Sequence, residues 1–345
     1  MIRPGVAAPN LAPRIGREVV RERGGVEYRE LKTRSLVNRC DSPRVPFEWT
    51  VNPYRGCAMG CRYCYAAYTH EYLGLEAADT FHTAIYAKTG DLDETTRRLV
   101  TTARRGERVA LGTATDPYQP GEAELRVTRR FLERAAQVRG LRLGITTKGA
   151  IVLRDLDLLQ RIHARSRLSV QISLNSLDAD LLRRIEPWAP PPEVRIEVLR
   201  RLVEAGLSVG LSLSPILPGI TDQEESLDAL IGRAAAVGVE RMWGSLLFLR
   251  SPTREKYLDF IAREFPRYLE AYRRAYASSS HLAGAYRKRI EEMVRCLRKK
   301  HGLDREDASV SGAWARLPEQ LDLFSGGPDP RRRASFGYSL LGRAE

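Results

Sequence analysis

The sequence predicts an α/β protein whose core is a partial, TIM-like barrel of about six β-strand–α-helix units. From residue 46 onward, short apolar and β-branched runs alternate with amphipathic stretches of helical length. Such alternation is typical of parallel strands joined by right-handed helical crossovers. Polar residues also gather just after the expected strands, where barrels of this kind carry their chemistry. Six units are too few for a closed eightfold barrel, so we expect an open one.

The individual elements follow from the same pattern. Strands are expected at residues 47–51, 109–113, 141–146, 168–174, 207–213 and 242–248. Helices are expected between them at residues 92–104, 122–139, 154–164, 179–185, 193–205 and 223–237. Gly140, Gly206 and Gly238 directly follow three of these helices, where a left-handed cap residue is common.

The composition predicts four segments along the chain. Residues 1–45 are rich in Pro, Arg and Gly and are expected to form an extended N-terminal arm. Residues 46–250 hold the barrel, and residues 251–302 are expected to be helical, with an aromatic stripe that core packing explains. Residues 303–345 are polar and are expected to form a flexible tail.

Charge and hydropathy limit the classes of protein and partner. The chain of 345 residues carries a formal net charge of +13, nearly all of it from arginine. This excess favours a nucleic-acid partner, and an arginine-rich composition with solvated helix faces is the alternative. No stretch has the length of a secretory signal core or of a membrane span, so a cytoplasmic protein without a membrane partner is expected.

The most informative stretch contains three of the five cysteines within eight residues. Cys57, Cys61 and Cys64 have the spacing C-x3-C-x2-C, which lets three thiolates converge from one loop. Iron–sulfur clusters are held by cysteine thiolates, and three ligands leave one iron of a cubane open. Gly56 and Gly60 supply the backbone freedom that a tightly curled loop needs.

Disulfide bonds and zinc account less well for these cysteines. A disulfide scaffold is disfavoured because five cysteines in 345 residues are few and odd in number. A structural zinc site usually has four ligands in two separated pairs, and no second CxxC or HxxxH pair is present. Zinc binding or a coincidental spacing remain the alternatives to an iron–sulfur cluster.

The C-x3-C-x2-C run, with an aromatic residue before its last cysteine, resembles the radical S-adenosylmethionine (SAM) superfamily. The wider block at residues 52–65 is similar to the branch related to spore photoproduct lyase. The resemblance implies a radical SAM barrel in which the open iron of a [4Fe–4S] cluster binds the amino and carboxylate groups of SAM. It also implies reductive cleavage of SAM to a 5′-deoxyadenosyl radical, with electrons from an external donor of the flavodoxin or ferredoxin type.

Several strand ends match motifs of the same branch. Residues 115–120 read TDPYQP, and the resemblance makes Asp116 a SAM or substrate contact, although Asp-Pro also suits a plain turn. It makes Lys148 a partner of the SAM carboxylate, although an exposed loop lysine is the alternative. Ser173 and Asn175 alternate with an apolar residue, so both are expected to face the barrel interior near SAM.

A further match is the EPxAP-type string that begins at Glu186, in which Glu186 or Arg195 is expected to help order the site. A rigid proline connector is the simpler interpretation. The segment at residues 215–219 resembles the stretch that lies against the adenine of SAM, and it also suits a turn.

The candidate catalytic residues are Tyr63 and Tyr65, which resemble the tyrosines flanking the last cluster cysteine of this branch. Tyr63 is also a candidate cofactor contact, and Tyr65 is a candidate hydrogen relay. In the lyase, a cysteine just after the second strand returns hydrogen to the product radical, but residues 112–115 contain none. Cys40 and Cys296 lie far away in the sequence, so reversal of a thymine dimer by the lyase's route is not expected.

The tail contains the string Gln-Leu-Asp-Leu-Phe between Gln320 and Phe324. It resembles the linear motif by which bacterial repair and replication proteins dock on the sliding clamp. A short segment packing against its own barrel is the alternative. Clamp docking would point to DNA as the substrate.

Together these patterns predict a lyase-like radical SAM enzyme that acts on a nucleic acid, with repair of a DNA lesion as the specific hypothesis. One alternative is radical modification of a peptide or a small metabolite. Another is a non-catalytic iron–sulfur adaptor docked on the sliding clamp.

Overall fold

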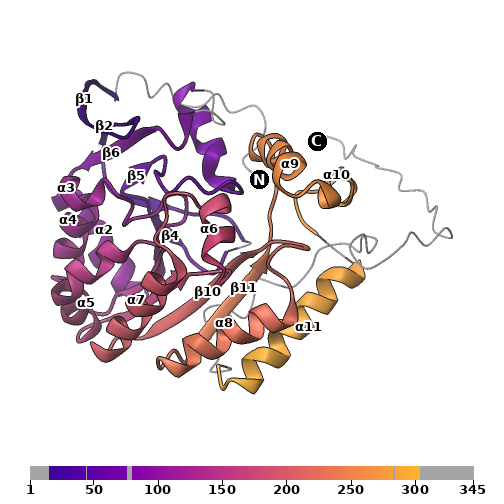
Figure 1. Cartoon of the computed structure of the whole chain (residues 1–345). Helices are drawn as coiled ribbons and strands as arrows, with labels where there is room; N and C mark the ends of the chain where they lie inside the picture. The colour runs from indigo at the N-terminus through magenta and orange to yellow at the C-terminus, as the bar shows by residue number, and fades with distance from the viewer. Residues whose placement is uncertain (1–14, 44, 76–79, 283, 304–345) are drawn as a thin grey trace, which may run out of the picture.

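The computed structural model describes residues 15–43, 45–75, 80–282 and 284–303 (Figure 1). Its core is a seven-stranded sheet with the order β11-β10-β9-β8-β7-β4-β3. Only β3 runs antiparallel to its neighbour, and the other six strands are parallel. This arrangement confirms the predicted partial barrel. The strands are β3 (Val37–Arg39), β4 (Trp49–Val51), β7 (Arg108–Leu111), β8 (Arg142–Thr147), β9 (Arg167–Ser173), β10 (Val209–Ile216) and β11 (Arg241–Leu246).

The crossover helices lie on the outer side of this sheet (Figure 1). They are α2 (Leu92–Arg104), α3 (Glu122–Leu125), α4 (Val127–Ala135), α5 (Leu156–His163), α6 (Ala179–Ile185), α7 (Pro192–Glu204) and α8 (Glu224–Ala236), with a 3₁₀ segment η3 (Ala150–Asp155) before α5. The predicted positions of α2 and α6 match to the residue. All six parallel strands also overlap their predicted ranges, because apolar periodicity reports the buried face directly.

One predicted helix is broken. Residues 122–139 were expected to form one helix, but Arg126 adopts a left-handed backbone with φ of 52° and separates α3 from α4. The fully buried Glu122 explains the break, because its carboxylate accepts hydrogen bonds from the amides of Thr128 (2.9 Å) and Arg129 (3.2 Å). A side chain that caps the next helix in this way favours a new helix start over continuation.

The N-terminal region differs from the extended arm that the sequence predicts. A second sheet, here called the N-terminal sheet, has the order β1-β2-β6-β5. Its strands are β1 (Ile15–Arg23), β2 (Val26–Thr33), β5 (Tyr54–Arg55) and β6 (Ala84–Gly90). Tyr28, Tyr54 and Ile85 on one face are buried in the main core. The pairing of β2 with β6, more than 50 residues away, gives the first segment its order, and no local pattern reports such a partner.

The C-terminal helices pack on the barrel with the predicted aromatic stripe inward. They are α9 (Thr253–Glu264), the short η4 (Pro266–Tyr268), α10 (Leu269–Ala275) and α11 (Gly284–Lys300). The buried Tyr272 hydroxyl donates to the carbonyl of Pro218 (2.8 Å), and the Tyr276 hydroxyl donates to the carbonyl of Leu247 (2.9 Å). The Tyr286 hydroxyl donates to the carboxylate of Asp222. These bonds attach the helices to loops at the carboxyl ends of β10 and β11.

The basic helix α11 lies along α8 (Figure 1). Several of its cations have carboxylate partners: Arg287 pairs with Glu291, Arg295 with Glu292, and Lys300 with Asp228 (2.7 Å). These pairs favour a solvated face over a phosphate-binding surface on this helix. The motif between Gln320 and Phe324 lies outside the described residues. The division into four segments stays a prediction. Within the described ranges, no helix combines the length and apolar character that a membrane span requires.

Candidate functional site

The three cysteines of the motif lie in one loop, residues 56–64, here called the cysteine loop. The loop connects β5 to the 3₁₀ segment η2 (Tyr65–Leu73), at the carboxyl end of the barrel. Cys57 and Cys61 are each 7% exposed. Gly60 has a φ of 71°, and a Cβ atom there would lie 2.7 Å from the ring of Trp188. The loop therefore needs glycine at this position for both its backbone conformation and its contact with Trp188.

The TDPYQP motif after β7 fixes the backbone of the cysteine loop. The hydroxyl of Thr115 donates to the carbonyl of Gly56 (2.6 Å). The fully buried Gln119 accepts from the amide of Ala58 through Oε1 (2.9 Å). The amide of Asp116 points at the sulfur of Cys57 (3.4 Å), as is favourable for a thiolate acceptor. The motif therefore contributes to the site mainly by holding the cysteine loop in its conformation.

Distant segments complete the support for this loop. His82 contacts the carbonyl of Cys57 through Nδ1 (2.7 Å), and the hydroxyl of Thr253 donates to the carbonyl of Cys64 (2.7 Å). The amide of Trp188 donates to the carbonyl of Met59 (3.3 Å). Sequence reasoning missed these residues, because His82 and Thr253 belong to no motif and their roles arise only from tertiary contacts.

The cysteine loop fits a [4Fe–4S] cluster. Burial raises the pKa of Cys57, and the negative charges of Asp116 and of the other two cysteines raise it further, so these three thiols lie within reach of one another electrostatically. In the described part of the chain, no three His, Cys, Asp or Glu side chains are placed to hold a metal ion. The ligands of a cubane bind different irons and need not meet at one point. Thiols must lose their protons to bind iron, and a bound cluster would stabilise the thiolates that burial alone disfavours.

A buried group of charged side chains lies beside the loop. The carboxylate of Glu186 is 2.5 Å from Arg195 and 3.9 Å from Lys148, and both Glu186 and Arg195 have side chains only 1% exposed. The Tyr63 hydroxyl donates to Glu186. The Lys148 ammonium lies 5.9 Å from the centroid of the Tyr63 ring. Glu186, which sequence analysis named only as an ordering residue, is the centre of this group.

The charges in this group are mutually dependent. Burial alone would raise the pKa of Glu186, but Arg195 and Lys148 outweigh it and hold that pKa below its usual range. Burial alone would lower the pKa of Lys148, but Cys61 and Glu186 outweigh it and raise that pKa. The group therefore keeps a positive charge beside the sulfur of Cys61, where an anionic cofactor group would be favoured.

Asp116 connects the ends of β7 and β8. One carboxylate oxygen accepts from the Thr147 hydroxyl (2.5 Å) and the Tyr118 amide (2.9 Å), and the other accepts from the Lys148 amide (2.7 Å). Both oxygens already have partners within the chain. The residue thus orients Lys148 and the cysteine loop, in addition to any contact with a ligand.

Ser173 and Asn175 join the same region, Ser173 through Arg195 and Asn175 through the loop after β10. The Arg195 guanidinium donates to the carbonyl of Ser173 (3.0 Å), and Ser173 is 5% exposed. The amide nitrogen of Asn175 donates to the carbonyl of Pro215 (3.1 Å). Its Oδ1 atom is buried and has no hydrogen-bond partner among the described residues. An unpaired buried acceptor is unfavourable, so a donor on a bound ligand would be stabilised there.

Tyr65 stands apart from this group, at the edge of the site. Its side chain is 43% exposed and makes an edge contact with Phe248, with ring centroids 6.0 Å apart. Its hydroxyl donates to the carbonyl of Thr113, directly after β7. Residues 112–115 contain no cysteine, and Tyr65, the first residue of η2, reaches this strand end through its hydroxyl.

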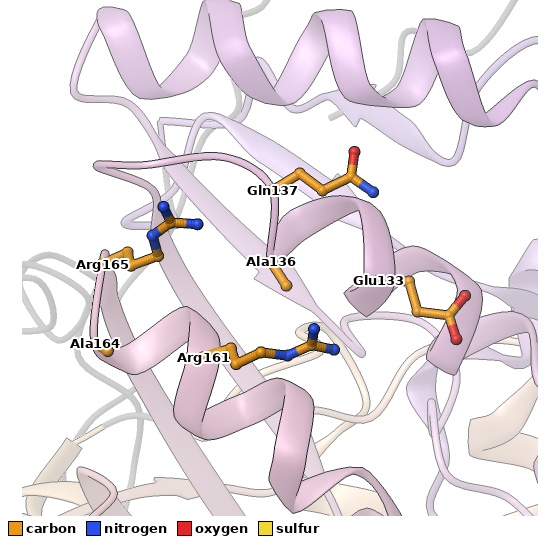
Figure 2. Close-up of a pocket in the computed structure, with 6 residues that line it drawn as sticks. All are labelled: Glu133, Ala136, Gln137, Arg161, Ala164 and Arg165. Atoms are coloured by element: carbon orange, nitrogen blue, oxygen red, sulfur yellow. The ribbon is translucent and has the colours of Figure 1, made fainter.

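A surface cavity of about 640 Å³ lies between the ends of α4 and α5 (Figure 2). Its lining comes from the C-terminal ends of α4 and α5 and the turns that follow them: Glu133, Ala136, Gln137, Arg161, Ala164 and Arg165. No predicted site residue lines it. The cavity faces the amino ends of the strands and has no part in the site built around the cysteine loop.

Comparison with known sequences gives related proteins across most of the chain. An uncharacterized protein of Mycobacterium tuberculosis is 35% identical over 303 residues, which cover 87% of this chain and 89% of the relative. An uncharacterized protein of Methanocaldococcus jannaschii is 26% identical over 283 residues, covering 80% of this chain and 95% of the relative. Neither relative has a described activity.

Among solved structures, spore photoproduct lyase has the same fold. The lyase complexed with dinucleoside spore photoproduct matches with a TM-score of 0.61 and 16% identity, covering 79% of both chains. A lyase variant with bound AdoMet and the same dinucleoside matches with a TM-score of 0.59 and 15% identity, again over 79% of both chains. This likeness places the cysteine loop and the surrounding strand ends in a known enzyme fold.

The family model of the radical SAM superfamily matches residues 51–231, which include the cysteine loop, Asp116, Lys148, Ser173 and Asn175. Because this superfamily consists of enzymes, the match does not support the alternative of a non-catalytic iron–sulfur adaptor. The chain belongs to the radical SAM superfamily, as an enzyme whose cofactors are a [4Fe–4S] cluster and S-adenosylmethionine.

Proposed function

We propose that this protein is a cytoplasmic radical SAM enzyme that acts on a base of a nucleic acid, in repair of a DNA lesion. In this proposal Cys57, Cys61 and Cys64 bind the cluster. The residues that bind SAM or orient its contacts are Tyr63, Asp116, Lys148, Ser173 and Asn175.

The cofactors supply the radical chemistry: an electron from an external flavodoxin- or ferredoxin-type donor cleaves SAM, and the resulting 5′-deoxyadenosyl radical abstracts hydrogen from the substrate. The protein's residues bind and orient. Lys148 presents a buried positive charge, which suits the SAM carboxylate. The Oδ1 atom of Asn175 accepts a hydrogen bond from SAM, which satisfies its unpaired buried acceptor. Tyr63 donates a hydrogen bond to Glu186, and its ring lies beside the ammonium of Lys148.

The position of Tyr65, exposed and hydrogen-bonded near the end of β7, is the observation that carries the proposal. Its hydroxyl lies at the carbonyl of Thr113 and its ring is open to solvent, so the residue reaches both a substrate at the barrel mouth and the end of β7. We therefore assign Tyr65 the return of a hydrogen atom to the product radical: the O–H bond of Tyr65 breaks, the C–H bond of the product forms, and one electron from the external donor with a proton from solvent restores the tyrosine. This role requires no cysteine after β7, in keeping with the sequence there.

Charge supports a nucleic acid as the substrate class. The net charge of +13 favours a polyanionic partner. Spore photoproduct lyase, which has the same fold, was solved with a dinucleoside photoproduct. The string between Gln320 and Phe324 adds the proposal that the enzyme docks on a bacterial sliding clamp.

Deuterium transfer tests the substrate class. The reconstituted enzyme is reduced anaerobically with SAM and with DNA deuterated at the bases, both undamaged and damaged. We expect deuterium in 5′-deoxyadenosine, and a Cys61→Ala control is expected to form none. If SAM is cleaved but no nucleic acid donates deuterium, the substrate class is wrong. Transfer from a peptide or metabolite instead would establish the alternative function.

A further inference from the structure

One face of the N-terminal sheet gathers positively charged side chains. In the strand register, Tyr86 on β6 lies opposite Arg29 on β2 and opposite Arg55 on β5. Lys88, two positions further along β6, lies opposite Leu31. Directly opposed residues share a face, and so do residues two apart on one strand. Arg29, Arg55 and Lys88 therefore all belong to one face.

This face points away from the barrel, because the opposite face is buried in the main core. The segment η2 covers part of it. Leu73 packs on Leu31 and Tyr86 in a small apolar cluster separate from the core. Arg55 donates to the carbonyl of Thr69 (2.6 Å), which fixes its side chain under this segment. Segment η2 therefore lines part of this face, and its contact with Arg55 orders the guanidinium.

Lys88 is the unusual member. The residue is only 8% exposed, and no carboxylate in the described part of the chain contacts its ammonium. The nearby charge that acts on it is that of Arg55, which has the same sign. Burial, together with Arg55, lowers the pKa of Lys88 to about 7. The nearby carboxylate on this face, Glu27, pairs with Arg29 at 2.8 Å.

A buried ammonium without a counter-ion is unfavourable and is relieved when an anion binds. Arginine offers a planar fork and lysine a compact charge, and a tetrahedral oxyanion can accept from both. We propose that Lys88 and Arg55 form a binding site for a phosphate group on the outer face of the N-terminal sheet, and that this phosphate belongs to a nucleic-acid backbone. The second half of the statement rests on the proposed function.

The position of the site suits that role. Arg55 ends β5, and the cysteine loop begins at the next residue. A nucleic-acid strand held at Arg55 and Lys88 therefore runs beside the loop that carries the cluster. Contacts to phosphate fix the register of a bound strand and carry no sequence information. The site would hold the strand while another part of the enzyme reads the base.

The test measures binding of fluorescent duplex DNA to the reconstituted enzyme as a function of salt, below pH 7, where Lys88 is charged. For Lys88→Met we expect binding to weaken several-fold and the log–log salt slope to become shallower by about 0.9, the loss of one phosphate contact. Lys88→Gln is expected to do the same. The matched control is Lys32→Met, because Lys32 is exposed and lies opposite Thr89, on the other face of the sheet.

A second arm distinguishes the source of the phosphate, with thermal unfolding measured in inorganic phosphate. If inorganic phosphate raises the midpoint of the wild type but not of Lys88→Met, and the DNA salt slope is equal in both, the site takes free phosphate and the nucleic-acid half is wrong. If neither quantity depends on Lys88, the site itself is refuted. A Lys88-dependent DNA slope without deuterium transfer from DNA would instead retain the site and refute the proposed base chemistry.

Discussion

At the scale of single residues, the site depends on buried charged side chains that neutralise one another inside the protein. Glu186 illustrates this, because its carboxylate meets Tyr63, Arg195 and Lys148 inside the protein. Removing one charge there leaves the others buried and uncompensated, which costs far more than the intact pair contributes. Single substitutions in this group therefore report on its role directly.

Replacement of Glu186 by Gln should destabilise the protein strongly. Arg195, with a side chain 1% exposed, would lose its carboxylate partner, so we expect the free energy of unfolding to fall by about 3–5 kcal/mol. Urea unfolding of the apo protein measures this. Glu193→Gln is the control, because Glu193 pairs with Arg233 on the surface and its loss should have little effect. Equal stability of the two variants would contradict the central role of Glu186.

Replacement of Tyr65 by Phe should separate the two halves of the reaction. SAM cleavage and hydrogen abstraction should continue, while repaired product per 5′-deoxyadenosine should fall about tenfold or more, since the hydroxyl at Thr113 is lost. Tyr68→Phe, in the same 3₁₀ segment, serves as the control. An unchanged product ratio in Tyr65→Phe would remove Tyr65 from the mechanism.

Lys88 should make stability depend on pH. Its folded pKa of about 7 lies below the ordinary 10.5, so the unfolded chain binds more protons between these values. The free energy of unfolding should therefore rise with pH in this window, by at most about 1.4 kcal/mol per pH unit. The charged and titratable groups on the same face are Glu27, Arg29, Arg55 and Tyr86, and the charge of Arg55 acts on Lys88.

Urea unfolding of the wild type and Lys88→Met at pH 7 and above measures this effect, and the difference between the two isolates Lys88 from other titrating groups. We expect the wild type to gain stability relative to the variant as the pH rises. A constant difference would show that Lys88 keeps an ordinary pKa.

At the scale of elements, the barrel was predictable and the N-terminal sheet was not. Strands such as β9 are apolar on the buried face, and helices such as α6 begin at a capping Asp178, so local sequence reports them. Strand β6 was missed, because its residues gain order from β2 and β5 rather than from a pattern of their own.

The candidate site divides in the same way. The cysteines and Lys148 were named because their types and spacing carry chemistry. His82 and Thr253 bind the backbone of the cysteine loop from other parts of the chain, and a hydrogen bond to a carbonyl requires no particular motif. Asp116 was named as a ligand contact, while its observed bonds brace the chain itself.

The C-terminal helices offer a test at this scale. Tyr272→Phe removes the hydroxyl that satisfies the carbonyl of Pro218 and leaves that carbonyl without this partner. We expect the free energy of unfolding to fall by about 1–3 kcal/mol. Tyr268→Phe is a matched control, because the Tyr268 ring packs against Gly219 in the same loop without a described hydrogen bond from its hydroxyl. Denaturant unfolding that gives equal losses for both variants would show that the hydroxyl is unimportant.

At the scale of the whole molecule, segments from both ends of the chain support the loops of the site at the carboxyl end of the open barrel. The N-terminal sheet supplies β5, which leads into the cysteine loop, and the C-terminal helices hold the loops after β10 and β11. The site therefore requires all described parts of the chain to be folded together.

The net charge predicts the behaviour of the whole protein with DNA. If six phosphates are contacted, affinity should fall by about 10³-fold between 50 and 200 mM salt. Fluorescence anisotropy with undamaged duplex DNA measures this. Weak binding that does not respond to salt would mean that the arginine excess of this chain is compositional.

The supports of the cysteine loop also set an order of events during synthesis. Cys57, Cys61 and Cys64 emerge early from the ribosome, but Trp188 and Thr253 follow more than a hundred residues later. Since chains are made at about 5–20 residues per second, the thiols wait for many seconds without the contacts that define their positions. A cluster delivered early would meet three thiols on a loop that still lacks these supports. The arrival of Thr253 therefore sets the earliest moment at which the finished loop can receive its cofactor.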